Sequence, residues 1–495
     1  MPKHSRPVPR VPKGFRDIDS ETLRLRKEAV ANVTAVFDSW GFEPLETPAM
    51  EYVDCLGKFL PESDAPQGGI YALRDEDDEW IALRYDLTAP LARYVAANFQ
   101  NLPKPFRRYQ VGHVWRVEKP GPGRFREFVQ VDLDTVAAPD PVADAEVVMI
   151  LCEAMEAIGM QRQDYVVRMS DRRIINGLLA LGGIANPSQM ITTMRAIDKL
   201  DRIGLDGVAA LLYKGRRDES GDFTPGAGLD LNQINRIIQF LSLEIGEMTR
   251  SDVAIRMMDL VGSTKDGKQG ALALKQMDTL LAAAGYDDNR AIIDPTVVRG
   301  LAYYTGPVFE VNLTFDVTGD DGLPRVFGSV AGGGRYDELV ERFIGQKVPA
   351  TGASIGVDRL LAAWKARGKS KAATSELVVV TVMEQSRLAD YFTMASELRA
   401  AGFRAEVFTG SGGFAKQVRY ADARGAACAV IAGSDEFDKG RVSIKDLRLG
   451  EHLSAEIAER DKWLADRPAQ VTVAREKMVE EINSIVKRYR VEKAL

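Results

Sequence analysis

The feature that most constrains this fold is a pair of alternating runs on either side of the stretch KPGPG. Residues 106 to 135 read FRRYQVGHVWRVEKPGPGRFREFVQVDLDT. Glycines and prolines between two runs of period two predict an antiparallel β-hairpin. Successive strand residues point to opposite faces, so Phe125, Val129, Val131 and Leu133 make one apolar face of the second strand. The other face carries Arg124, Arg126, Phe128, Gln130, Asp132 and Asp134.

This second face combines arginines, an aromatic ring, an amide and carboxylates. On the partner strand, Arg116 and Glu118 share a face. One interpretation is a solvated sheet surface with ion pairs. The other is a binding surface, because an aromatic ring among charges suits stacking of a flat heterocycle between Phe128 and a guanidinium. The residues alone leave both interpretations open.

A second unusual stretch is VVRGLAYYTGPVFEV, residues 297 to 311. It sets Arg299 and the adjacent Tyr303 and Tyr304 directly before a strand-like run. Neither composition nor local propensity explains this arrangement, so we treat the three side chains as candidate functional residues.

The stretch GSVAGGGRYDELVERF, residues 328 to 343, places three glycines before a helical run. Such glycines allow close backbone approach and a helix N-terminus that faces an anion. A tight turn is the equal alternative. The stretch lacks the Gly-Lys-Ser/Thr ending of a P-loop and does not match the dinucleotide-binding fingerprint.

In TGASIGVDRLLAAW, residues 351 to 364, a small-residue strand is expected to lead into a helix with Arg359 in its first turn. A cation there is unfavourable unless an anion compensates it, although an arginine that simply faces solvent is the alternative. Taken together, Arg116, Arg299 and Arg359 would suit binding of a triphosphate without a P-loop.

The patterning predicts an α/β protein, with an α+β core and separate domains. We expect a first domain over 1–370 with a helical insertion at about 185–285, and a linker at KSKAATSE, residues 369–376. Short Val-rich strands that alternate with helices over 376–465 predict a small α/β domain with a mostly parallel sheet. Residues 471–495 are expected to form a charged, helical C-terminal tail.

Composition excludes several classes of function. No apolar run reaches 18 residues, so no transmembrane helix is expected, and the basic, proline-rich N-terminus lacks the apolar stretch of a secretory signal. The cytoplasm is therefore the expected location. Three widely spaced cysteines and three histidines predict neither a disulfide framework nor a metal site. The net charge of −6 means that any RNA partner requires a local basic patch.

Three segments resemble the class motifs of class II aminoacyl-tRNA synthetases: FEPLETPAMEYVD, VWRVEKPGPGRFREF and GASIGVDRL. The stretches VRGLAYYTGPVFE and AGGGRYDELV resemble the signatures of the histidyl-tRNA synthetase family within that class. The resemblance covers about residues 11 to 455. It implies an antiparallel catalytic sheet with flanking helices over 1–370, and an anticodon-binding domain over 376–465.

The resemblance also implies roles for individual residues. Arg116 would hold the α-phosphate of ATP, with Glu118 and Arg124 placing the nucleotide and with Phe128 and Arg359 enclosing the adenine. Asp86, Thr88 and Gln130 would bind the α-amino group of histidine, and Asp134, Tyr303 and Tyr304 its imidazole. Arg299 would lie between the substrate carboxylate and the α-phosphate, so that Arg299, Arg116 and Gln130 are the residues expected to be catalytic.

The reaction implied is ligation of L-histidine to the 3′ end of its cognate tRNA through a histidyl-adenylate, in a homodimer that uses ATP with Mg²⁺. The magnesium follows from ATP alone, and no protein ligand is assigned to it. A non-catalytic paralogue is the alternative, either the regulatory subunit of ATP phosphoribosyltransferase or a tRNA-binding regulator. Lys416 and Arg419 lie on one face of an expected helix and are candidates for contact with the anticodon, although a solvated face explains them equally well.

Overall fold

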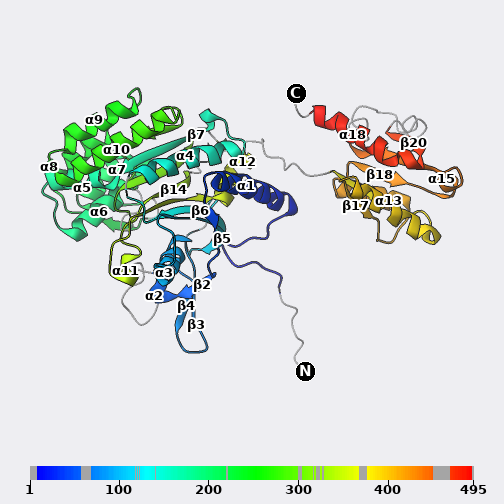
Figure 1. Cartoon of the computed structure of the whole chain (residues 1–495), viewed down its shortest axis with the longest axis horizontal. Coiled ribbons are helices and arrows are strands. Elements are labelled where there is room, and N and C mark those ends of the chain that lie inside the picture. Colours follow the sequence, from blue (N-terminus) through cyan, green and yellow to red (C-terminus); the bar gives the residue numbers. More distant parts are fainter. Residues whose placement is uncertain are drawn as a thin grey trace. The chain divides into compact units, whose positions relative to one another are not determined.

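The chain divides into two compact units, Met1–Ala372 and Ala373–Leu495. The computed structural model describes residues 8–56, 69–117, 119, 121, 123–139, 141–218, 221–298, 304–315, 317–318, 324–325, 328–366, 376–449 and 469–492 (Figure 1).

The predicted hairpin is confirmed. Strands β5 (Phe106–Trp115) and β6 (Glu127–Val136) pair in antiparallel register over their whole length, from Phe106 opposite Val136 to Trp115 opposite Glu127. This register places Arg108 directly opposite Asp134. Beyond the strands, Arg116 and Arg126 continue the pairing through the bond from Arg116 N–H to Arg126 C=O at 2.9 Å.

Within the described residues, eight strands form the main sheet in the order β1-β5-β6-β15-β14-β11-β7-β10. The six inner strands pair antiparallel, and the edge strands β1 and β10 pair parallel to their neighbours. The remaining bounds are β1 (Glu43–Pro44), β7 (Tyr165–Asp171), β10 (Ala291–Ile293), β11 (Pro307–Leu313), β14 (Ser329–Arg335) and β15 (Ala350–Gly356).

Helices cover the apolar face of this sheet (Figure 1). They are α1 (Ser20–Ser39), α4 (Val142–Ala157) and α12 (Val357–Ala366). Val129, Val131 and Leu133 of β6 lie in one buried core with residues of all three helices. Removing such a side chain by substitution with alanine typically costs about 2–5 kcal/mol. Core packing thus fixes which face of β6 remains available for function.

Local sequence sets both ends of α1. The carboxylate of Asp19 accepts a hydrogen bond from Thr22 N–H at 2.7 Å, which caps the first turn. The helix ends at Ser39, Trp40 is its C-cap, and Gly41 follows with φ of +75°. A residue without a Cβ takes this left-handed conformation without strain.

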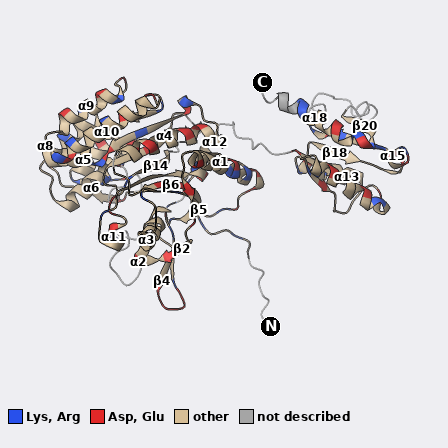
Figure 2. Ribbon diagram, in the orientation of Figure 1, with Lys and Arg blue, Asp and Glu red and all other residues tan. Residues whose placement is uncertain are grey.

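The segment 185–285 contains five helices among the residues that the structure describes: α6 (Pro187–Ile197), α7 (Leu200–Leu212), α8 (Leu231–Leu241), α9 (Arg250–Val261) and α10 (Lys265–Ala283). A short hairpin, β8 (Gly215–Arg217) with β9 (Phe223–Pro225), joins α7 to α8. Helix α10 packs on α5 (Arg172–Leu181), which follows β7. Basic and acidic residues are interspersed over these helices (Figure 2).

The three glycines of AGGG do not precede a helix. Gly332, Gly333 and Gly334 lie inside β14 and pair with both β11 and β15. The short helix α11 (Glu341–Ile344) begins seven residues after Gly334. A Cβ on Gly333 would lie 2.0 Å from the carbonyl oxygen of Gly352. The predicted close backbone approach therefore occurs between neighbouring strands, and the glycines form neither a helix start that faces an anion nor a tight turn, the two alternatives that the sequence left open.

The remaining elements of the first unit lie beside the main sheet. Strands β2 (Met50–Tyr52), β3 (Ala72–Arg74) and β4 (Trp80–Leu83) form a small antiparallel sheet, with α2 (Val53–Leu56) and α3 (Thr88–Asn98) beside it. Strands β12 (Val317–Thr318) and β13 (Pro324–Arg325) form a separate pair. The segment between β4 and α3 supplies Asp86, and Thr88 is the first residue of α3.

The second unit contains a mixed sheet, and not the mostly parallel one expected. Among the residues described, the strand order is β17-β16-β18-β19-β20, with parallel pairing among the first three strands and antiparallel pairing from β18 to β20. The strand bounds are β16 (Leu377–Val380), β17 (Arg404–Val407), β18 (Cys428–Ile431), β19 (Arg441–Asp446) and β20 (Gln470–Ala474). The α-helices among the described residues of this unit are α13 (Leu388–Ala400), α14 (Phe414–Ala423), α15 (Ser434–Asp438) and α18 (Met478–Glu492).

The expected tail is likewise part of this unit. Residues 470–474 form strand β20 rather than helix, and β20 pairs with β19. Helix α18 buries Met478, Ile482, Ile485 and Val486 in the core of the unit. Its apolar stripe is the reason that it packs against the sheet instead of projecting into solvent. None of the described helices in either unit is long and apolar enough to cross a lipid bilayer.

Candidate active site

The polar face of β6 is buried, so it is not a solvated sheet surface. Gln130 is 7% exposed, and Asp132 and Asp134 are each 2% exposed. Buried carboxylates are unfavourable unless cations or hydrogen-bond donors satisfy them. The environment of each carboxylate therefore indicates what this face can bind.

Asp134 is held by a cation and a phenol. Its Oδ2 lies 2.9 Å from Nη2 of Arg108, whose side chain is fully buried and also donates to the Leu87 carbonyl at 2.9 Å. The hydroxyl of Tyr336 donates to Oδ1 of Asp134. Burial raises the pKa of Asp134, while Arg108 and Tyr336 act in the opposite direction. Its position is therefore fixed from two sides.

Asp86 approaches this face from the start of α3. Its Oδ1 accepts a hydrogen bond from Ala89 N–H at 2.9 Å, and Thr88 is the first residue of the helix. Burial raises the pKa of Asp86, and the hydrogen bond from Ala89 and the charge of Arg116 lower it. Asp86 also raises the pKa values of Asp132 and Asp134, so the three carboxyl groups interact electrostatically.

Three buried acceptor atoms on the β6 face accept no hydrogen bond within the described part of the chain: Oε1 of Gln130, Oδ1 of Asp132 and Oδ2 of Asp134. Oδ2 of Asp134 is paired with Arg108, so Oε1 of Gln130 and Oδ1 of Asp132 are left for a ligand. A buried acceptor left unsatisfied costs about 1–3 kcal/mol, so such atoms mark the place of a ligand with N–H donors. An ammonium group beside three carboxylates meets that requirement.

Arg116 and Phe128 lie together at the end of the hairpin. The guanidinium carbon of Arg116 is 5.3 Å from the centre of the Phe128 ring, and Nε donates to the Tyr85 carbonyl at 2.9 Å. The backbone of Arg124 pairs with that of Gly121. Thus a guanidinium and an aromatic face occur side by side, as the binding-surface interpretation requires.

Arg359 lies in the first turn of α12, as the sequence predicts. Its Nη1 donates to the Ser329 carbonyl of β14 at 2.6 Å. The preceding residue, Asp358, accepts from Arg26 and from the backbone N–H of Val129 on β6. The helix start that carries Arg359 is thereby anchored to β6 and to β14.

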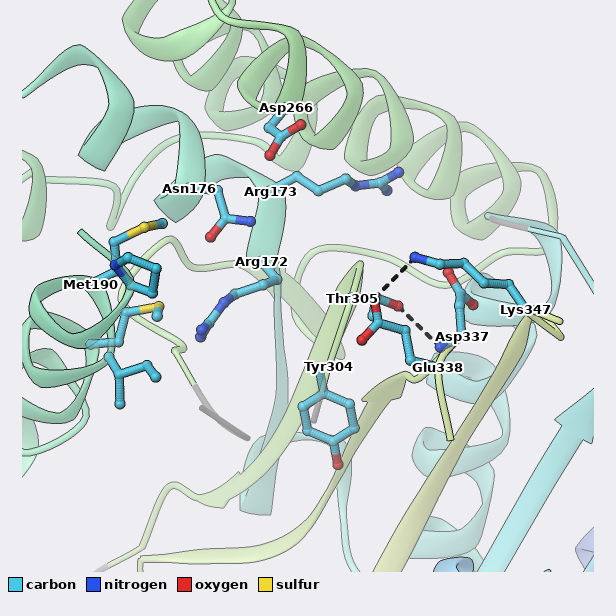
Figure 3. A pocket seen from close by; sticks show the side chains of 13 residues that line it. Arg172, Arg173, Asn176, Met190, Asp266, Tyr304, Thr305, Asp337, Glu338 and Lys347 are labelled. Atoms are coloured by element: carbon cyan, nitrogen blue, oxygen red, sulfur yellow. Dashed lines mark hydrogen bonds and ion pairs between the residues drawn. The ribbon is translucent and has the colours of Figure 1, made fainter. Parts of the chain in front are cut away.

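Tyr304 lies between the β14 backbone and a cavity of about 530 Å³ (Figure 3). A Cβ on Gly334 would lie 3.0 Å from the Tyr304 ring, so this ring packs directly on the strand. Tyr304 also interacts electrostatically with Tyr336, the donor to Asp134. The same cavity is lined by Arg172 and Arg173 at the start of α5 and by Thr305, Asp337 and Lys347, among others.

Three of the predicted site residues, Glu118, Arg299 and Tyr303, lie outside the described residues. The others fall into three groups, Gln130 and Asp134 with Asp86 and Thr88, Arg116 with Phe128 and Arg124, and Tyr304 beside Tyr336, and Arg359 lies apart from them in the first turn of α12. Their assignments to ATP and histidine stay predictions.

Sequence reasoning missed four residues of this site: Arg108, Asp132, Tyr336 and Ser354. The signal for Arg108 was available, since counting back from the hairpin turn pairs it with Asp134. Asp132 was recognised on the polar face but received no role. Tyr336 and Ser354 lie on other segments, whose distance from β6 no local pattern indicates.

Comparison with known proteins identifies the family. A family model described as histidyl-tRNA synthetase matches residues 14–360, and one described as anticodon-binding domain matches residues 376–485. The histidine–tRNA ligase of Dinoroseobacter shibae is 50% identical, over 98% of this chain and 99% of that protein. That of Brucella abortus is 49% identical, over 96% of each.

Solved structures agree with these sequence matches. The crystal structure of histidyl-tRNA synthetase from Nostoc sp. PCC 7120 is 30% identical and has a TM-score of 0.74, with coverage of 98% of this chain and all of the other. A structure from Bacillus halodurans, described as an ATP phosphoribosyltransferase regulatory subunit/histidyl-tRNA synthetase, shares the fold at 22% identity and a TM-score of 0.64. With a family model that spans most of its length and half-identical relatives along nearly all of it, the chain belongs to the histidyl-tRNA synthetase family of class II aminoacyl-tRNA synthetases.

Proposed function

We propose that this chain is a histidine–tRNA ligase that joins L-histidine to the 3′ end of its cognate tRNA in two steps. The observation that carries the proposal is the buried polar face of β6, where unsatisfied acceptors of Gln130 and Asp132 lie beside Asp134. Free histidine supplies matching donors, namely an α-ammonium group and a ring N–H. The 50% identical relative named histidine–tRNA ligase supports the same activity.

In the first step, the carboxylate of histidine attacks the α-phosphorus of ATP. A carboxyl O–P bond forms, the bond to the β-phosphate oxygen breaks, and pyrophosphate leaves. Two anions approach each other in this step, so guanidinium groups at the α-phosphate lower the barrier. Arg116 and Arg299 are assigned to this position. No side-chain nucleophile is needed, because positioning and charge stabilisation suffice.

The nucleotide and amino acid would occupy neighbouring places along the hairpin. Adenine would stack on Phe128 and be enclosed by Arg359, with Glu118 and Arg124 placing the rest of the nucleotide. Asp86, Thr88 and Gln130 would bind the α-ammonium group. Asp134, Tyr303 and Tyr304 would bind the imidazole, and a site that hydrogen-bonds a substrate N–H rejects analogues lacking it by roughly 10⁴-fold.

Magnesium would enter with ATP and neutralise charge on its phosphates. Within the described residues, no group of three or more His, Cys, Asp and Glu side chains has the arrangement of a metal site. We therefore assign no protein ligand to the ion.

In the second step, a terminal ribose hydroxyl of the tRNA attacks the activated carbonyl, an ester bond forms, and AMP leaves. The second unit would hold the anticodon, in keeping with its match to an anticodon-binding domain. Its helix α14 carries Lys416 and Arg419, whereas Arg424 just beyond it is paired with Glu406 at 3.1 Å. Lys416 and Arg419 are accordingly the better candidates for RNA contact.

The protein would act as a cytoplasmic homodimer. The segment FEPLETPAMEYVD, which resembles the dimer-interface motif of the class, leads into the small sheet, where Met50, Tyr52 and Leu73 are 44–50% exposed. Met50 and Tyr52 lie on β2 and Leu73 on β3, the two outer strands of this sheet, and large exposed apolar side chains fit an interface better than solvent. Sedimentation velocity on the full chain should give twice the mass of one chain.

Amino-acid-dependent ATP–pyrophosphate exchange with each of the twenty amino acids tests this function. Histidine alone should support exchange, and Arg299→Ala should reduce it by on the order of 10² or more. Arg256→Ala removes an exposed arginine on α9 and should leave the rate unchanged. Absence of exchange with every amino acid would instead favour the non-catalytic paralogue.

A further inference from the structure

Asp132 occupies the central place on the substrate face of β6 and has no role in the proposed function so far. It lies two residues from Gln130 and two from Asp134 on the same face, and it is 2% exposed. Its cross-strand partners are Gln110 on β5 and Ser354 on β15. A carboxylate buried at this point between two assigned binding residues requires an explanation.

Ser354 connects Asp132 to Gln130. Nε2 of Gln130 donates to Oγ of Ser354, and Ser354 lies directly opposite Asp132 in the β6–β15 register, where hydrogen bonding from its hydroxyl lowers the pKa of Asp132. An ionised carboxylate only accepts hydrogen bonds, and a hydroxyl has a single proton to donate. Once Ser354 donates to Asp132, its oxygen can only accept from Gln130.

This chain of bonds determines which end of the Gln130 amide faces the ligand. Because the NH₂ group is engaged by Ser354, the acceptor Oε1 is left over, and it is one of the unsatisfied buried atoms of the site. We propose that Asp132 is a positioning residue which, through Ser354, orients Gln130 so that Oε1 accepts a hydrogen bond from the α-ammonium group of the amino-acid substrate. The inference rests on the proposed function, which places that group beside Gln130.

The charged groups around Asp132 make the arrangement dependent on pH. Asp134 on the same strand and Asp86 from the start of α3 raise the pKa of Asp132, Arg108 on β5 lowers it, and Arg84 after β4 also faces it. Burial is the largest influence, and together these groups raise the pKa of Asp132 to about 7. A protonated Asp132 can donate to Ser354, which then can donate to Gln130 and favour the reversed amide.

The sign of the effect follows directly. As pH rises through about 7, Asp132 loses its proton, Oε1 of Gln130 turns to the ligand, and histidine binds more tightly. Binding of the ammonium group favours the ionised carboxylate, so at pH 7 the protein should release about half a proton from Asp132 for each histidine bound.

The test is calorimetric titration of the full chain with histidine over pH 6 to 8.5, in two buffers of different ionisation enthalpy. Asp132→Asn should weaken binding by about tenfold at pH 8 and remove the half proton released at pH 7. Free histidine titrates in this range too, and comparison of the variant with the wild type cancels that contribution. KM for ATP should not change.

A double-mutant cycle tests whether the two residues act as one chain. Ser354→Ala should weaken histidine binding as much as Asp132→Asn does, and the double variant should be no weaker than either. Thr135→Val, which changes a buried polar residue on the opposite face of β6, should bind histidine like the wild type. Thermal denaturation of each variant verifies that it is folded.

Two outcomes overturn the inference. The first is that the losses of histidine affinity in the two single variants add up in the double variant. The second is that Asp132→Asn leaves both the histidine affinity and the proton release unchanged. Either result would show that Asp132 does not orient Gln130. A wild-type protein that binds no histidine would refute the proposed function itself, and the two failures are thereby distinguishable.

Discussion

Gly352→Ala is the substitution that most directly probes how Asp134 is held. Gly352 lies on β15 directly opposite Asp134 of β6. A Cβ there would lie 2.1 Å from Oδ1 of Asp134 and 2.4 Å from the carbonyl oxygen of Leu133. An ordinary contact needs about 3.4 Å, so the Asp134 carboxylate must move by roughly 1 Å and break its bond to Tyr336. Only glycine is compatible with the observed position.

The magnitude follows from these contacts. Overpacking of this kind lowers the free energy of unfolding by about 1–3 kcal/mol. If Asp134 receives the imidazole N–H, loss of that charged hydrogen bond should cost a further 1.5–3 kcal/mol in histidine binding, which raises KM for histidine by about 10- to 150-fold. KM for ATP should stay within about twofold, because no nucleotide contact is altered.

The assay is histidine-dependent ATP–pyrophosphate exchange, with urea denaturation to measure stability. Gly356→Ala is the matched control on the same strand, since its Cβ would come no closer than 3.4 Å to Val330 C=O. It should leave both quantities unchanged. A Gly352→Ala protein that loses stability yet keeps the wild-type KM for histidine would refute the role of Asp134 in reading the ring.

Three further predictions concern buried charges and thiols. Asp144→Asn breaks the fully buried ion pair with Arg335, which is 2.5 Å long, and should lower the free energy of unfolding in urea by about 3–5 kcal/mol. Glu338→Gln breaks the exposed pair with Lys347 and should lower it by less than about 1 kcal/mol. Equal losses in the two variants would contradict the burial argument. Because the pKa of Asp132 is raised to about 7, its ionisation destabilises the ligand-free protein as pH rises from about 4 to 7. The free energy of unfolding of Asp132→Asn, relative to that of the wild type, should therefore be about 2–3 kcal/mol higher at pH 8 than at pH 5. An equal difference between variant and wild type at both pH values would rule this out. Burial raises the pKa of Cys152 to about 12 and also raises that of Cys428, and both thiols are buried, whereas Cys55 is half-buried with its pKa raised to about 11. A thiol reagent at pH 8 should therefore modify Cys152 and Cys428 slowly until urea unfolds the chain. Rapid reaction of these two thiols in the native protein would be inconsistent with their burial.

The parts of the fold that sequence predicted are those fixed by local pattern. The β5–β6 hairpin follows from alternation and a Gly-Pro turn, and the end of α1 follows from Gly41. Arg359 was placed correctly in the first turn of its helix because the strand-to-helix change lies within a few residues. In each case, the deciding interactions join residues close together in the chain.

The parts that were wrong depend on partners far away in the sequence. The glycines of β14 were expected before a helix because the chain that follows them is helical in character. The absence of a side chain is instead required by the neighbouring strand β15, whose backbone comes close to them at Gly352. Strand β20 was expected as helix because its pairing with β19 spans a long interval of chain. Likewise, only the folded sheet shows that Ser354 lies against Asp132.

The two-faced burial of β6 also limits how this protein can change over evolution. On one side Val129, Val131 and Leu133 are committed to the core, and on the other Gln130, Asp132 and Asp134 are committed to one another's hydrogen bonds and charges. Almost every substitution along this strand would alter stability or the ligand site. New amino-acid preferences would therefore have to arise through the neighbouring positions on β15 and before α3, which makes those two segments the natural targets for directed libraries.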